Sequence, residues 1–219
     1  QVIQRDRHAH FVTTLALVAA TLEKIATEIR GLQRTEIREV EEPFQEGQTG
    51  SSSMPHKRNP ELTERVCGLS RLIRGYAVTA MENVALWGER DISHSSAERL
   101  ILPDACMALD YIIDLLKGVI VGLRVYEDRM LSNMELTRGL LFSQKTMLLL
   151  VEKGMARENA YKIVQENSMS TWDNNHDFRD LIKNDKRVTS LVSDEELQEL
   201  FKYENYTKYI DDIYKKAAI

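Results

Sequence analysis

The chain has 219 residues, which is enough for one large domain or two small ones with a sizeable core. Its formal net charge of −5, from 29 Lys and Arg against 34 Asp and Glu, argues against general binding to nucleic acid or to an anionic membrane. Cys67 and Cys106 lie within helical apolar patterns, so we expect buried free thiols in a cytoplasmic protein and no metal site. We interpret the apolar stretches as too short to span a bilayer, and we expect no signal peptide.

Three long segments carry apolar residues that alternate four and three positions apart. The three stripes are Phe11, Leu15, Val18, Leu22, Ile25, Ile29 and Leu32; Leu62, Val66, Leu69, Ile73, Tyr76 and Ala80; and Leu102, Cys106, Leu109, Ile113, Leu116, Ile120 and Leu123. This spacing keeps an apolar stripe on one face of long helices that cross at a shallow angle of roughly 20°. Three such helices cannot enclose a core on all sides. We therefore expect part of a larger bundle, completed by further sequence, by partner subunits or by both.

Shorter amphipathic segments follow Arg124. They cover residues 127–133, 136–153, 158–168, 177–183, 194–201 and 206–218, with polar connectors at 173–176 and 184–186. No run alternates with period two for long enough to predict a strand. The predicted fold is therefore all-α, with a long antiparallel helix bundle over residues 1–124 and a small all-helical domain over residues 125–219.

Between the first two long segments, residues 50–60 have the sequence GSSSMPHKRNP. The glycine and serines favour a loop, and Pro55 and Pro60 each disfavour regular structure immediately before them. Asn59 is a good helix N-cap, Pro60 suits the first helical position, and Glu61 places negative charge in the first turn. By composition alone such a loop is most often a solvated connection. Its hydroxyl, ammonium and amide groups nevertheless gather at a helix start, where an anionic substrate would bind well.

A second polar cluster, WGERDISHSSAER at residues 87–99, precedes the third long segment. Ser95 and Glu98 have the spacing of a capping box, which predicts a helix start. Arg90 and Arg99 bracket that start. Because a helix N-terminus adds N–H donors and positive potential, the same residues would also make a good phosphate cradle.

The loop resembles the signature of the fumarase/aspartase superfamily, whose members cleave C–N or C–O bonds and release fumarate. The pattern GSSxMPxKxNP is matched at every fixed position between Gly50 and Pro60, and we call residues 45–60 the signature loop. The His56 and Arg58 variant of the loop most resembles the adenylosuccinate lyase family. So do the sequences of residues 1–6, 38–44 and 87–99. The resemblance covers nearly all of this chain but only about the second half of a normal family member.

The catalytic residues implied by this resemblance are Ser51, Lys57, Asn59 and Glu64. Ser51 would remove the proton next to a carboxylate, Lys57 would stabilise the resulting dianion, and Asn59 would hydrogen-bond the same carboxylate. Glu64 would support the site one turn into the helix. Sequence physics alone does not choose among the three loop serines, and Asn59 is equally compatible with a purely capping role.

The substrate-binding residues implied by the resemblance are Gln1, Ser52, Met54, Arg65, Arg90, Ser95 and Arg99. Gln1 would contact the succinyl part, and Arg90, Ser95 and Arg99 would hold the nucleotide phosphate. Ser96 replaces Ser95 if the alignment shifts by one position. The resemblance also implies a small-molecule nucleotide substrate, no metal or organic cofactor, and a homotetramer whose sites are shared between subunits.

The chain departs from the family in what it lacks. Its histidines, at positions 8, 10, 56, 94 and 176, match none of the family motifs for the general acid or for phosphate binding. We therefore expect a fragment that is inactive alone. Alternatives are another superfamily enzyme, such as argininosuccinate lyase or 3-carboxymuconate cycloisomerase, a catalytically silent structural relative, or a helical oligomerisation module.

Overall fold

The computed structural model describes residues 3–44, 54, 57–88 and 90–218. The chain divides into two compact units, Gln1–Arg129 and Met130–Ile219, whereas the sequence placed the division between residues 124 and 125. Helices make up most of both units, so the predicted all-α class is confirmed.

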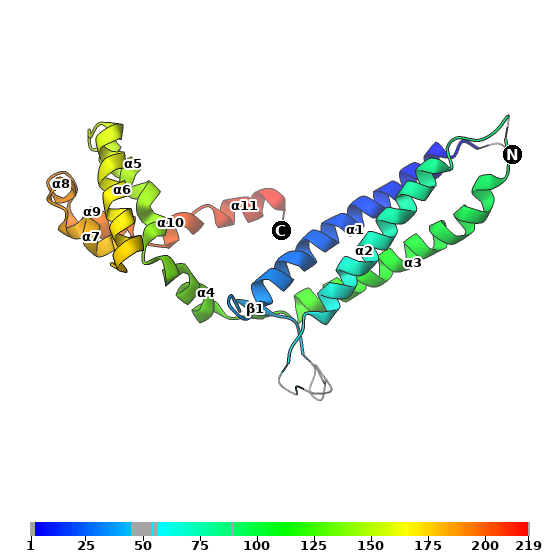
Figure 1. Cartoon of the computed structure of the whole chain (residues 1–219), viewed down its shortest axis with the longest axis horizontal. Helices are drawn as coiled ribbons and strands as arrows, with labels where there is room; N and C mark the ends of the chain where they lie inside the picture. Colours follow the sequence, from blue (N-terminus) through cyan, green and yellow to red (C-terminus); the bar gives the residue numbers. More distant parts are fainter. Residues whose placement is uncertain (1–2, 45–53, 55–56, 89, 219) are drawn as a thin grey trace. The chain divides into compact units, whose positions relative to one another are not determined.

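Unit 1 is built on three long helices that lie side by side: α1 (Asp6–Gln33), α2 (Glu61–Glu82) and α3 (Ser93–Val121) (Figure 1). After α1, the short strand β1 (Val40–Glu41) pairs antiparallel with β2 (Arg124–Val125), with Val40 opposite Val125. The sequence did not predict these strands, because two residues are too few to show a period-two pattern. The strand pair joins the chain ahead of the signature loop to the end of α3.

The face of α1 that packs within unit 1 is lined mainly by small residues. Its buried positions are Ala9, Val12, Ala16, Ala19, Ala26 and Ile29. The predicted stripe was therefore only partly correct, since Phe11, Val18 and Ile25 are 47%, 40% and 38% exposed. A 4-3 pattern identifies an apolar face but does not say which of two neighbouring stripes meets the partner helix. The stripe of small side chains is the buried one in α1, because small side chains let helix backbones approach closely.

The other two helices follow the predicted stripes more closely. α2 buries Val66, Ile73 and Ala80, as expected. On α3 the buried face is rotated slightly, so that Ile113 and Ile120 are exposed. Unit 1 therefore presents large apolar side chains on its surface, as expected for part of a larger bundle.

Two expectations from composition were wrong. Cys67 is buried, but Cys106 is exposed. Among the described residues one helix, α1, is long and apolar enough to cross a membrane, by length and composition alone. A helix at the centre of a bundle has the same composition, and α1 packs against both α2 and α3.

Unit 2 is a set of shorter helices. The chain passes through α4 (Glu127–Met134), 3₁₀ turns at Glu135–Thr137 and Leu140–Phe142, α5 (Ser143–Glu152), α6 (Arg157–Asn174), α7 (Phe178–Asn184), α8 (Lys186–Thr189), α9 (Asp194–Leu200), α10 (Glu204–Thr207) and α11 (Ile210–Ala217). The helix predicted from residue 136 begins only at Ser143. Arg138 and Gly139 have φ angles of 49° and 81°, which no right-handed helix contains. Conversely, α6 continues past its predicted end at residue 168.

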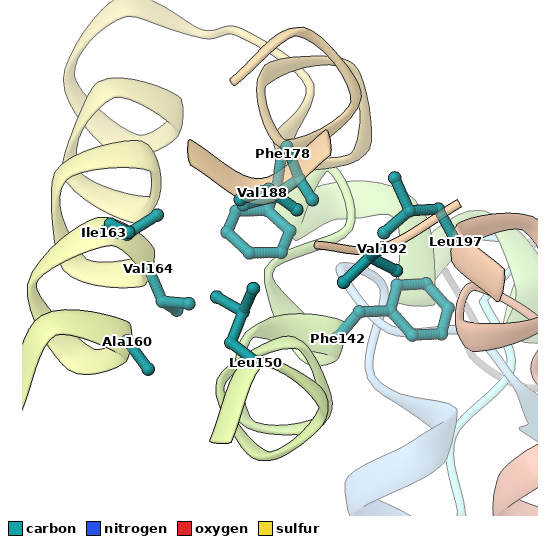
Figure 2. Close-up of a cluster of buried hydrophobic side chains, with 10 residues drawn as sticks. Phe142, Leu150, Ala160, Ile163, Val164, Phe178, Val188, Val192 and Leu197 are labelled. Carbon is teal, nitrogen blue, oxygen red and sulfur yellow. The ribbon is translucent and has the colours of Figure 1, made fainter. Parts of the chain in front are cut away.

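Buried side chains from the second 3₁₀ turn to α9 converge to form the core of unit 2 (Figure 2). The cluster consists of Phe142, Leu150, Ala160, Ile163, Val164, Phe178, Ile182, Val188, Val192 and Leu197. Phe142 is fully buried, and its ring lies edge-on to Phe201 with the ring centroids 5.4 Å apart. The Tyr203 ring is equally close to it. Phe142 thus joins the last helices of the unit to α5.

Replacing Phe142 by alanine should lower the free energy of unfolding by about 3–5 kcal/mol, because the cavity left among neighbouring rings cannot fully collapse. Urea unfolding followed by circular dichroism measures the change. Leu148→Ala is the matched control, because Leu148 on α5 is 47% exposed, and it should change the value by less than about 1 kcal/mol. Equal losses in the two variants would contradict this account of the core.

Candidate active site

The structure places the predicted site residues in two groups at opposite ends of α2. Gln1, Ser51 and Ser52 lie outside the described residues. The group at the start of α2 consists of Met54, Lys57, Asn59, Glu64 and Arg65. The group between the end of α2 and the first turns of α3 consists of Arg90, Ser95 and Arg99. α2 has 22 residues, so the two groups are separated by roughly 33 Å within one chain (Figure 1).

At the start of α2 the predicted side chains face solvent. Lys57, Asn59 and Glu64 are all exposed. Arg65 is exposed too, but its guanidinium is bound to the Glu61 carboxylate one turn earlier, and this hydrogen bond raises the pKa of Arg65. The side chains of Lys57 and Asn59 are thus exposed to solvent beside a helix N-terminus, where the helix dipole adds positive potential.

The first amides of α2 are capped by Glu42, and not by Asn59 as predicted. The residue at the N-cap position is Pro60, which provides no side-chain cap. Glu42 is 5% exposed, and its carboxylate accepts hydrogen bonds from the backbone N–H groups of Leu62 at 3.1 Å and Thr63 at 2.8 Å. The Glu42 carboxylate, 20 residues before Leu62, therefore caps α2 in place of a local side chain. The Asn59 amide is then available for a ligand.

Glu41, the residue before Glu42, contacts the last part of the signature loop at Arg58. Its carboxylate is bound to the guanidinium of Arg58, and a cavity of about 440 Å³ opens beside this pair. The cavity is lined by Gln33, Thr35, Arg38, Val40, Glu41 and Arg58. Sequence reasoning missed both glutamates, because nothing in the local pattern distinguishes a buried acid from a solvated one.

The start of α3 is capped by Asp91. The helix begins at Ser93, so the predicted capping box of Ser95 with Glu98 was wrong. The Asp91 carboxylate accepts hydrogen bonds from the backbone N–H of Ser93 at 2.8 Å and of Trp87 at 2.9 Å. The Ser93 hydroxyl, with these two amides, lowers the pKa of Asp91 to about 2. Ser95 lies in the first turn of α3, so its hydroxyl does not serve as the helix cap.

Glu98 has a different partner from the one predicted. It forms an ion pair with Arg5 at 2.9 Å, in which each side chain is only 12% exposed. This pair joins the segment that precedes α1 to the first turns of α3. The chain that follows Gln1 is thereby held beside the segment that carries Arg90 and Arg99.

Two family models match this chain. A model described as the C-terminus of adenylosuccinate lyase matches residues 139–217, and a model described as lyase matches residues 1–75. Adenylosuccinate lyase from Thermotoga maritima is 52% identical over 216 residues, which cover 99% of this chain and 50% of that protein. The chain thus spans about half the length of the curated relative that it matches.

Three solved structures have a similar fold. The 3-carboxy-cis,cis-muconate lactonizing enzyme from Pseudomonas putida has a TM-score of 0.81 and 30% identity, over 91% of this chain and 44% of that one. Fumarate lyase from a Mesorhizobium species has a TM-score of 0.81 and 25% identity, over 92% and 44%. The β-carboxy-cis,cis-muconate cycloisomerase from Acinetobacter calcoaceticus is similar in fold, with a TM-score of 0.84, 24% identity and coverages of 97% and 47%.

Substituting Ser93 by alanine should raise the pKa of Asp91 from about 2 toward its ordinary value of 3.8, because the Ser93 hydroxyl is the main cause of the shift. A lowered pKa means that Asp91 supports the folded state above pH 4 and loses this effect as the pH falls through 2. Carboxyl carbon NMR titration measures both values. Ser96→Ala is the control, since the Ser96 hydroxyl contacts the Ser93 carbonyl instead. An unchanged midpoint in Ser93→Ala would show that the Ser93 hydroxyl does not bind the Asp91 carboxylate.

Proposed function

Because the chain belongs to the adenylosuccinate lyase family of the fumarase/aspartase superfamily, we propose that it is part of a lyase that eliminates fumarate from two succinylated nucleotides. The substrates are adenylosuccinate, which gives AMP, and the succinyl-carboxamide ribotide (SAICAR), which gives the carboxamide ribotide. Both reactions belong to purine biosynthesis. We place the enzyme in the cytoplasm.

The observation that carries this proposal is the 52% identity to adenylosuccinate lyase over 99% of the chain. The muconate lactonizing enzyme shares the fold, but only at 30% identity. The segment with Arg90, Ser95 and Arg99 also favours a nucleotide, since a phosphate group needs a cradle that a small dicarboxylate does not. Arg90 and Arg99 are exposed beside the N-terminus of α3, which is a suitable place for a phosphate.

The chemistry requires a base, a fixed cation and an acid. In our proposal Ser51 removes the proton from the carbon next to a carboxylate, and the electron pair moves onto that carboxylate. Lys57 and Asn59 stabilise the dianion, and the C–N bond then breaks to release fumarate. The departing nitrogen takes its proton from an acid outside this chain. The exposed positions of Lys57 and Asn59 before α2 support these roles.

We propose that the intact enzyme is a homotetramer with sites shared between subunits. The two groups of site residues lie at opposite ends of a helix of 22 residues, so one chain cannot place both around a single substrate. A second copy running antiparallel would bring one group next to the other. The exposed large side chains of the bundle, such as Phe11, Ile113 and Ile120, provide an apolar surface for such packing.

The Ser51→Ala variant of the full-length enzyme should release fumarate from adenylosuccinate at least about 100-fold more slowly than the parent, because the proposed base is gone. Fumarate formation is followed by absorbance, with folding checked by circular dichroism. Ser52→Ala and Ser53→Ala are matched controls from the same loop. If Ser52→Ala loses more activity than Ser51→Ala, the base is Ser52. If the parent releases no fumarate, adenylosuccinate is not the substrate.

The purified 219-residue chain should show no measurable turnover, because it lacks the acid that protonates the leaving nitrogen. Adding the missing part of the enzyme as a separate polypeptide should restore fumarate release. Turnover by the chain alone would show that it carries a complete site.

A further inference from the structure

Two adjacent carboxylates, Glu41 and Glu42, are buried at the base of the signature loop. They are 7% and 5% exposed. Burying an ionised carboxylate costs several kcal/mol unless it is paired and hydrogen-bonded, so each must have specific partners. Successive side chains of an extended chain point to opposite sides, and β1 ends at Glu41. The two acids therefore reach different parts of the structure.

Glu41 connects the signature loop to the strand pair. One carboxylate oxygen lies 2.5 Å from Arg58 Nη1 and 4.0 Å from Arg124 Nη1. The other oxygen accepts a hydrogen bond from the Tyr126 hydroxyl at 3.1 Å. Arg124 lies in β2 and Tyr126 directly follows it, and β2 is paired with β1 within unit 1. Arg58 is thus tied to the bundle through a carboxylate that is itself held in place.

Gln33, the last residue of α1, links this contact to the second acid. Its side-chain Nε2 lies 3.5 Å from the Arg58 carbonyl oxygen, and its Oε1 accepts the backbone N–H of Glu42 at 3.0 Å. The Arg58 guanidinium also lies over the Phe44 ring, 5.4 Å from its centroid. Both the backbone and the side chain of Arg58 are therefore held.

Glu42 fixes the other side of the same short segment. Its hydrogen bonds to Leu62 and Thr63 set where α2 begins. The Thr63 hydroxyl donates to the same carboxylate, and its oxygen lies 3.1 Å from the Pro60 carbonyl oxygen. Residues 57–60 thus lie between two anchored points.

We propose that Glu41 and Glu42 are positioning residues for the elimination, because they set the places of Lys57 and Asn59. These two residues flank Arg58, and adjacent Cα atoms are only about 3.8 Å apart, so a shift of Arg58 moves both. Glu41 acts through Arg58, and Glu42 acts through the start of α2. The role of these residues in the reaction rests on the proposed function. The contacts of Glu41 with Arg58 and of Glu42 with α2, which we call the clasp, do not depend on that function.

The kinetic test uses Glu41→Gln, Arg58→Met and the double variant in the full-length enzyme. Each single variant should lower kcat about tenfold or more while KM changes less than about twofold, because the misplaced groups act on the transition state. The double variant should be no worse than either single one, since both remove the same contact. Arg124→Met is the matched control. Arg124 contacts the same carboxylate and is similarly exposed, at 49% against 46% for Arg58, but it is not next to Lys57 or Asn59.

Three results would overturn the proposal: an unchanged kcat in Glu41→Gln, multiplicative losses in the double variant, or an equal loss in Arg124→Met. Multiplicative losses would mean that Arg58 acts on the substrate directly. An equal loss in the control would mean that Glu41 has only a general structural role.

Hydrogen exchange tests the clasp without any assay of activity. Glu42→Gln should accelerate exchange of the Leu62 and Thr63 amides, and Glu41→Gln should accelerate exchange of the Lys57 amide, which is bonded to the Met54 carbonyl. Amides in the middle of α3 should be unchanged in both variants. If the parent fails to release fumarate, the proposed function fails, and this measurement still decides on the clasp. Unchanged exchange at all three amides would refute it.

Discussion

Close packing along a line of small residues determines the structure of the long-helix unit. α1 buries Ala9, Ala16, Ala19 and Ala26, so it can lie close to α2 and α3. The larger apolar side chains of the same helix, such as Phe11 and Val18, are then turned outward. Exposed apolar surface on this scale is typical of a protein that packs against further chains. The choice of stripe thus both organises the unit and leaves large apolar side chains on its surface.

The length of α2 separates the predicted site residues into two groups. It places residues 57–60 at one end of a rigid helix, and the start of α3 with Ser95 and Arg99 follows its other end. Each end is then fixed by contacts that are distant in sequence: Glu42 with the first amides of α2, and Arg5 with Glu98 at the start of α3. The two groups of predicted site residues are thus held apart along one rigid helix.

Much of this arrangement could be predicted from the sequence. The 4-3 spacing of apolar residues gave three long helices, and the proline at position 60 marked the start of the second within one residue. The motif between Gly50 and Pro60 indicated the adenylosuccinate lyase family, in agreement with the family models and the 52% identical relative. Short local features were less predictable. Gly139 was a local signal for the break before α5, but the left-handed conformation of the preceding Arg138 is one that its residue type does not favour.

The sequence by itself determined which segments are helical, where the signature loop lies and which residue types it offers, because these depend on local pattern and composition. Only the tertiary structure decided which apolar stripe of α1 is buried, since periodicity does not distinguish two neighbouring stripes. It also decided that Glu41 and Glu42 are buried among hydrogen-bond partners, and that the half-buried Glu98 pairs with Arg5. A carboxylate has the same sequence signature whether it is solvated or buried, and only a partner from a distant part of the chain makes its burial favourable.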